Sequence, residues 1–97
     1  KYLRNSFLAT KVAFFNEVYD FCQMNNLEYD KIKELVGMDE RITTSHMQIP
    51  GPDGERGFGG ACFPKDTRAL LFTGLFFKSP FSILSEVVST NERIKNA

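Results

Sequence analysis

The chain has no tryptophan, one histidine, two cysteines and no net charge, because twelve basic side chains balance twelve acidic ones. Without an excess of positive charge, the composition does not favour nucleic acid or an anionic membrane as a partner. His46, Cys22 and Cys62 are not at metal-ligand spacing, so we expect no metal site. Unpaired thiols are typical of a cytoplasmic protein, and no apolar run is long enough to span a bilayer.

Strand patterns are also absent, and no Gly-x-Gly-x-x-Gly turn follows a strand, so we expect no dinucleotide-binding domain within this chain. Apolar residues instead recur at helical spacing through residues 2–24, and Asn25-Asn26 ends that segment. Shorter helices are expected over residues 31–36, 64–77 and 80–94. Asp30 is expected to cap the first of these and Ser79-Pro80 to start the last. The predicted fold is all-α, a small helical domain of residues 1–97 with a long N-terminal helix.

Ten phenylalanines supply more apolar surface than a small domain readily buries. The apolar face of residues 2–24 is also wider than contact with one core requires. We therefore expect this helix to be covered by its own core and by a second subunit or neighbouring domain, in a domain built for dimerisation. Lys1 has no capping residue before it and the pattern after Asn91 has no stop signal, which predicts a piece cut from a longer protein.

A glycine-rich segment, Gly57–Gly60, leads into Cys62. Glycines let the backbone turn tightly and approach a ligand, and Pro64 favours a helix start directly afterwards. A thiol at the start of a helix lies near free N–H groups and the positive end of the helix dipole, which favours an oxyanion built on the sulfur. This setting suits a nucleophile, although free cysteines are also common as small core residues. Cys22, in the aromatic N-terminal helix, is assigned to the core.

The segment Pro50–Asp66 ends in Gly-Phe-Gly-Gly-Ala-Cys-Phe-Pro-Lys-Asp and resembles the catalytic-cysteine motif of the UDP-glucose/GDP-mannose dehydrogenases. Lys1–Ala9 is similar to the lysine-and-asparagine helix of that family, and Asn91-Glu92-Arg93 to the link into its last domain. The resemblance covers essentially the whole chain but only the central helical domain of the family. It implies flanking NAD-binding and nucleotide-sugar-binding domains that this chain does not contain.

The resemblance implies an activity, since this family oxidises the primary alcohol of a sugar nucleotide to a carboxylate with two NAD molecules in turn. Cys62 is implied as the nucleophile that captures the aldehyde as a thiohemiacetal, which the second hydride transfer converts to a thioester. Lys1 and Asn5 share one helical face, where spacing alone indicates a solvated first turn, but the resemblance implies that they stabilise the oxyanion. Asp66 is implied as a base or water-orienting group. The chain alone is expected to be inactive.

Substrate and cofactor contacts are implied for a second set of residues. Phe58, Gly59 and Gly60 are expected to pack against the hexose, and Lys65 to contact the cofactor or a phosphate. Arg41 is implied to reach the sugar nucleotide bound in the neighbouring subunit of a homodimer. Lys11 and Asn16, on the N-terminal helix, are assigned structural or surface roles.

Alternatives stay open at the substrate loop, residues 43–60, which is longer than in some family members. Arg56 could meet a phosphate or a carboxylate such as Glu55, and His46 could serve as a general base. UDP-glucose is favoured as the substrate because the cysteine motif is most similar to that branch. The alternatives are GDP-mannose, another UDP-hexose, or a non-catalytic helical dimerisation module in which Cys62 is incidental.

Overall fold

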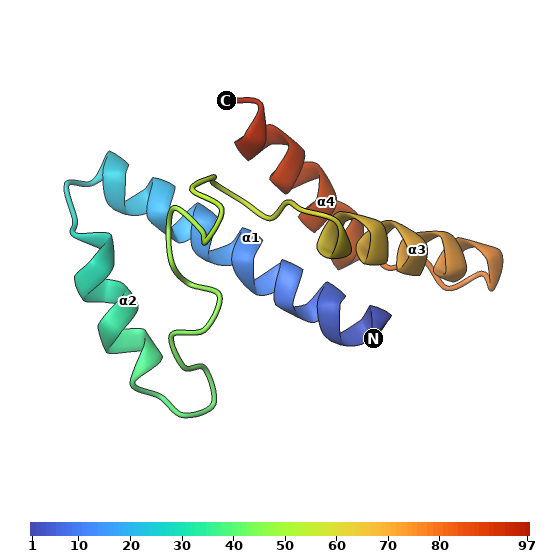
Figure 1. The fold of residues 1–97 in the computed structure, drawn as a ribbon, viewed down its shortest axis with the longest axis horizontal. Coiled ribbons are helices and arrows are strands. Elements are labelled where there is room, and N and C mark those ends of the chain that lie inside the picture. Colours follow the sequence, from blue (N-terminus) through green and yellow to red (C-terminus); the bar gives the residue numbers. More distant parts are fainter.

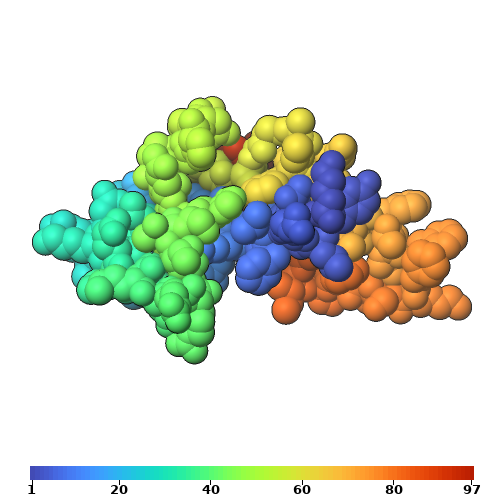
Figure 2. All heavy atoms as spheres, turned by 60° about the horizontal axis from the view of Figure 1, so that its bottom comes forward, coloured from blue at the N-terminus to red at the C-terminus, as the bar shows by residue number.

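Four helices and no strand make up the fold, which confirms the all-α prediction. The computed structural model describes all 97 residues. Its helices are α1 (Tyr2–Met24), α2 (Tyr29–Gly37), α3 (Cys62–Phe76) and α4 (Ser82–Lys95). The long α1 runs through the middle and contacts each of the other three (Figure 1). Figure 2 shows an elongated surface, with α2 at one end and the far end of α3 at the other.

Two helices begin earlier in the chain than the sequence predicts. α2 begins at Tyr29, so Asp30 lies inside its first turn instead of capping it. A carboxylate in the first turn still interacts favourably with the positive end of the helix dipole. α3 begins at Cys62, two residues before Pro64, which confirms the expected loop-to-helix junction at the cysteine.

The start of α4 is a correction, because Ser79-Pro80 neither caps this helix nor lies within it. The Ser79 N–H donates to the Gly74 carbonyl at 2.8 Å, and Lys78 between them has a left-handed φ of 61°. This arrangement closes α3, since a left-handed residue followed by a backward hydrogen bond satisfies the last free carbonyls of a helix. Ser79 therefore ends one helix, and the next begins only at Ser82.

The core lies where α1, α3 and α4 meet. Its buried cluster consists of Ala9, Ala13, Phe58, Leu84 and Val87. Two alanines on α1 let α4 approach closely, and the Phe58 ring from the loop before α3 fills the remaining space. The side chain of Cys22 is fully buried elsewhere on α1, which confirms its assignment to the core.

Much of the apolar surface stays uncovered, as the phenylalanine content predicts. Seven of the ten phenylalanines are exposed. Along α1, one stripe of side chains is between 58% and 83% exposed: Leu3, Phe7, Phe14, Phe21 and Met24. Spacings of three, four and seven residues place them on one side of the helix, away from the core. We call this set the α1 stripe. None of the four helices combines the length and apolar character needed to cross a membrane.

Candidate functional site

The Cys62 side chain is exposed at the first residue of α3. Before it, Gly57 and Gly60 take left-handed φ angles of 73° and 79°, which residues with a Cβ rarely adopt. No side chain caps the start of α3, so its first N–H groups remain free to interact with negative charge. The thiol is thus held at the positive end of a helix and open to solvent.

A buried carboxylate lies one helical turn beyond the cysteine. Asp66 is fully buried, and the Nδ2 of Asn5 donates to its Oδ2 at 2.7 Å. The other oxygen, Oδ1, is also buried and has no hydrogen-bond partner. Because an unpaired buried carboxylate oxygen is costly, this atom is suited to accept a hydrogen bond from water or a ligand hydroxyl. Residues four apart share a helix face, so Cys62 and Asp66 lie on the same side of α3.

The N-terminal turn of α1 brings Lys1 to this side of the molecule. In Figure 2 the first residues lie beside the start of α3, as the Asn5–Asp66 hydrogen bond requires. The Lys1 side chain is exposed and forms no ion pair or side-chain hydrogen bond. Its ammonium group is therefore free to bind an anion. Of the four expected catalytic residues, Asn5 and Asp66 are in direct contact, and Lys1 and Cys62 lie within one helical turn of them along their own helices.

A groove of about 620 Å³ lies beside the cysteine, between α1 and the loop before α3. Gly60 and Phe63, the neighbours on either side of Ala61-Cys62, both line it. The His46 ring stacks against the Phe63 ring, with centroids 5.9 Å apart and planes at 27°. Phe58 turns its ring into the core, so this part of the loop offers the groove mainly backbone and glycine surface.

Arg56 is bound within the chain by three groups of α1. The sequence left open whether this side chain meets a phosphate or a carboxylate. Its Nη1 donates to Asp20 Oδ1 at 2.9 Å, its Nη2 to the Asn16 carbonyl at 3.0 Å, and its Nε to Asn16 Oδ1 at 3.1 Å. The guanidinium also lies 4.8 Å from the centre of the Tyr19 ring. Its carboxylate partner is Asp20, not Glu55.

The first part of the loop is attached to the helices by two further side chains. The Lys11 ammonium donates to the Ile42 carbonyl at 2.6 Å, and partial burial lowers the pKa of Lys11. The Tyr29 hydroxyl donates to the carbonyl of the fully buried Met47. Burial, with smaller effects of Asp30 and Cys22, raises the pKa of Tyr29 to about 12, so it remains a neutral donor.

The model of the UDP-glucose/GDP-mannose dehydrogenase family, central domain, matches residues 1–93. The chain belongs to this family. The UDP-glucose 6-dehydrogenase TuaD of Bacillus subtilis (strain 168) is 39% identical over 93 residues, which are 96% of this chain and 19% of TuaD.

Two further relatives are the UDP-glucose 6-dehydrogenases of Rickettsia typhi (strain ATCC VR-144 / Wilmington) and Rickettsia felis (strain ATCC VR-1525 / URRWXCal2). The first is 41% identical over 92 residues, 95% of this chain and 20% of the relative. The second is 47% identical over 70 residues, 72% of this chain and 14% of the relative. The chain spans about a fifth of the length of the curated relatives it matches, or less. The resemblance inferred from Pro50–Asp66 and Lys1–Ala9 is confirmed.

The family relationship implies that the full-length enzyme uses NAD. This chain has four helices and no strand, and therefore no strand–turn–helix unit of the kind that holds a pyrophosphate. Lys65, in the first turn of α3, is exposed and unpaired, so its ammonium group fits a phosphate. No three His, Cys, Asp or Glu side chains converge as metal ligands would.

Arg41 does not join the other expected site residues of this family member. Its side chain is exposed and forms a two-point contact with Asp39, with Nη2 to Oδ2 at 2.7 Å and Nε to Oδ1 at 3.0 Å. These hydrogen bonds lower the pKa of Asp39 and raise that of Arg41. An exposed arginine paired two residues away can exchange that partner for another anion at little cost.

Two residues that hold the glycine segment were not predicted from the sequence: Asn16 and Asn91. Both are buried, and both bind the backbone of the glycine segment. A signal was present at each position, since Asn91 interrupts the apolar side of α4 and Asn16 follows two phenylalanines on α1. A buried amide must find partners, but the sequence does not say which.

Proposed function

We propose that this chain acts as the central domain of an NAD-dependent UDP-glucose 6-dehydrogenase, which oxidises UDP-glucose to UDP-glucuronate. The observation that carries the proposal is the exposed Cys62 thiol at the start of α3, one turn from the buried carboxylate of Asp66. The relatives named above are UDP-glucose 6-dehydrogenases, which supports UDP-glucose over GDP-mannose. Both cysteines are free thiols, and we place the protein in the cytoplasm.

The proposed chemistry uses the aldehyde formed from the primary alcohol of the hexose. The Cys62 thiolate adds to the aldehyde carbon, a carbon–sulfur bond forms, and the carbonyl electrons move to the oxygen as an oxyanion. The Lys1 ammonium and the second N–H of the Asn5 amide stabilise that charge, each donor contributing about 3–4 kcal/mol. NAD, when bound, accepts the hydride in both oxidation steps.

Hydrolysis of the resulting thioester requires an activated water. The free Oδ1 of Asp66 is suited to accept a hydrogen bond from that water and to take its proton. Water oxygen then bonds to the acyl carbon, the carbon–sulfur bond breaks, and the Cys62 thiolate is released. Asn5 keeps the carboxylate in place through its hydrogen bond to Oδ2.

The groove beside Cys62 is proposed to hold the hexose. Gly59 and Gly60 offer backbone to the sugar there, while Phe58 supports them from the core. Arg41 is proposed to bind the sugar nucleotide held by a partner subunit, and Lys65 to bind the cofactor or a phosphate. Both side chains are exposed and available for such contacts.

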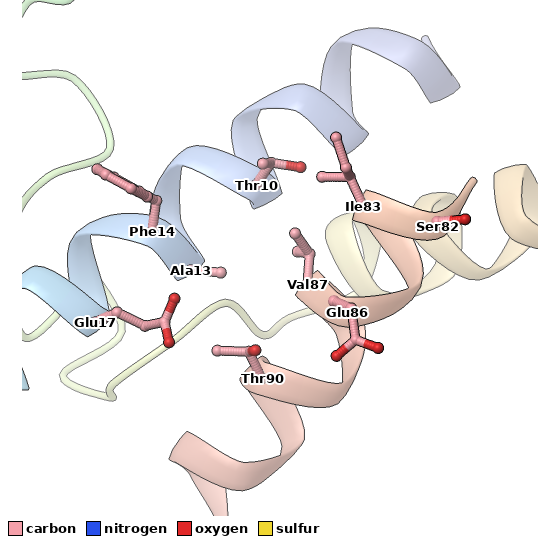
Figure 3. A pocket seen from close by; sticks show the side chains of 9 residues that line it. All are labelled: Thr10, Ala13, Phe14, Glu17, Ser82, Ile83, Glu86, Val87 and Thr90. Carbon is pink, nitrogen blue, oxygen red and sulfur yellow. The ribbon is translucent and has the colours of Figure 1, made fainter.

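We further propose that the protein is a homodimer that buries the α1 stripe. Next to this stripe, a hollow of about 430 Å³ lies between α1 and α4 (Figure 3). Phe14 from α1 and Ile83 from α4 border it and are 58% and 77% exposed. Exposed apolar surface beside a hollow is typical of a protein–protein interface.

The test is a Cys62→Ser substitution in the full-length protein that carries this chain. We expect the complete oxidation, measured as UDP-glucuronate formed from UDP-glucose, to fall by at least a thousandfold, because a serine hydroxyl is a far weaker nucleophile than a thiolate at neutral pH. Cys22→Ser is the matched control, and it should lower stability but leave turnover per folded enzyme unchanged. Full four-electron turnover by the Cys62→Ser enzyme would exclude the proposed nucleophile.

A further inference from the structure

Two buried asparagines from different helices bind consecutive residues of the segment that leads to Cys62. Asn91, on α4, is 6% exposed; its Oδ1 accepts from the Phe58 N–H at 2.7 Å and its Nδ2 donates to the Phe58 carbonyl at 2.9 Å. The side-chain amide thus satisfies both backbone polar groups of one residue, as a neighbouring β-strand would. This two-point contact fixes the orientation of the backbone at Phe58.

Asn16, on α1, binds the preceding residue. It is 2% exposed, and its Oδ1 accepts from the Gly57 N–H at 3.2 Å and from the Arg56 Nε at 3.1 Å. Its Nδ2 donates to the Val12 carbonyl within the helix at 2.9 Å, which fixes the amide rotamer. Both contacts to the loop therefore use the same oxygen atom of Asn16.

The contacts of Asn5 and Asn16 on α1 show how the segment that contains Cys62 is attached to this helix. Asn5 and Asn16 are eleven residues apart, roughly three helical turns, so they share one face of α1. Asn5 binds Asp66, four residues after Cys62, and Asn16 binds Gly57, five residues before it. The segment 57–66 therefore runs antiparallel to α1 and is attached to it at both ends.

A segment rich in glycine needs such contacts because glycine restricts its own backbone so little. Displacement of a reacting group by about 1 Å can lower a rate about a hundredfold. We propose that Asn16 and Asn91 are positioning residues, which hold the backbone at Gly57-Phe58 so that the Cys62 sulfur meets the bound aldehyde in a reactive geometry. This inference rests on the proposed role of Cys62 and adds two residues that do not themselves touch substrate.

The same conservative substitution separates the two positions. Asn16→Asp keeps an oxygen for Gly57 and Arg56, and its second oxygen faces the Val12 carbonyl within α1. Asn91→Asp instead turns a carboxylate oxygen towards the Phe58 carbonyl, in the loop itself. In the full-length protein we expect Asn16→Leu and Asn91→Asp to lower kcat by about ten- to a hundredfold, with KM for UDP-glucose changed less than kcat. Asn16→Asp should stay within about threefold of the unmodified kcat, since both loop contacts persist.

A second readout does not depend on turnover. We expect Asn16→Leu and Asn91→Asp to change the rate and pH dependence of Cys62 alkylation by iodoacetamide, whereas Asn16→Asp keeps the unmodified profile. Cys22→Ala is the stability control, because it opens a cavity elsewhere in α1 and leaves the loop contacts in place. Its kcat and Cys62 alkylation should match those of the unmodified protein.

The outcomes distinguish this inference from the proposed function. Turnover by Cys62→Ser would overturn the proposed nucleophile and, with it, this inference. If Cys62→Ser is inactive but Asn16→Leu behaves like Cys22→Ala, or Asn16→Asp is as impaired as Asn16→Leu, only the positioning role is wrong. If Asn16→Leu does not fold, amide hydrogen exchange of the unmodified protein tests the contacts instead. The Gly57 and Phe58 amides must then be protected, and rapid exchange at either would contradict the positioning role.

Discussion

Tyr29 shows how one side chain attaches the loop of residues 43–60 to α2. Its hydroxyl donates to the Met47 carbonyl, and both residues are buried. A buried carbonyl without a donor costs about 1–3 kcal/mol, so the neutral phenol is needed for the loop to stay in place. Lys11 has the same function a few residues earlier in the loop.

The pH dependence of folding should therefore include Tyr29. Its pKa is about 12 in the folded protein against 10.0 for an ordinary tyrosine. The folded state then keeps a proton that the unfolded chain releases, so stability is full below pH 10 and falls as pH rises towards 12. Tyr29→Phe should remove this slope and cost about 1–3 kcal/mol at neutral pH.

Chemical denaturation at several pH values measures both effects, and the phenolate absorbance of the two proteins gives the titration of Tyr29 by difference. An unchanged pH slope in Tyr29→Phe would show that another group causes the alkaline loss.

At the scale of elements, the loop that precedes α3 places the strictest limits on which residues it can contain. Gly54 and Gly57 have similar left-handed φ angles of 80° and 73°, but their surroundings differ. A Cβ at Gly54 would meet no atom within 4 Å, whereas one at Gly57 would overlap Asn91 Oδ1. The two glycines therefore share a backbone conformation, but only Gly57 is in contact with the buried asparagines.

Alanine substitution of each glycine separates backbone strain from the Asn91 contact. Gly54→Ala should cost about 1–2 kcal/mol, the penalty of a left-handed conformation alone. Gly57→Ala should cost at least about 1 kcal/mol more, because Asn91 must move and lose a hydrogen bond to Phe58.

Urea unfolding measures the two costs, and turnover should fall much further in Gly57→Ala than in Gly54→Ala. Equal losses of stability and activity in the two variants would mean that Asn91 adds no constraint at Gly57.

For the molecule as a whole, the unusual property is how little of its apolar surface it covers. Sixteen residues are buried, while fifteen large hydrophobic side chains are exposed. The elongated shape, 43 × 32 × 23 Å, separates these side chains over the surface. A chain with so small a core gains stability from any partner that covers the α1 stripe.

A charge in the α1 stripe should therefore weaken the proposed dimer. Phe14→Glu places a carboxylate beside Glu17 and Glu86, so burying this region would bring three negative charges together. We expect the dimer dissociation constant to rise at least a hundredfold, with little change in helix content because Phe14 is 58% exposed.

Sedimentation analysis of the full-length protein measures the effect. Leu35→Glu on α2 is the control, since Leu35 is 70% exposed and lies outside the stripe. If Phe14→Glu leaves the dimer intact, its interface lies elsewhere on the molecule.

Local patterns were sufficient for much of this molecule. The spacing of apolar residues identifies α1 and its end at Asn25-Asn26, and the motif before Cys62 identifies both the family and the loop-to-helix junction. Patterns were least reliable where a residue serves the preceding element, as Ser79 does in closing α3. Roles assigned to Lys1, Asn5 and Asp66 remain predictions, although the hydrogen bond between Asn5 and Asp66 joins two of them.

By itself, the sequence determined the helical class, the thiol at a helix start and the excess of phenylalanine, because each depends on residue type and short-range spacing. Only the tertiary structure decided that Arg56 binds Asp20, that Asn16 and Asn91 bind the glycine segment, and that the α1 stripe faces outward. These contacts join residues 33 to 41 positions apart or depend on which helix face packs inward. Hydrogen bonds of this kind depend on how whole helices pack together, and the spacing of residues within one segment does not determine that packing.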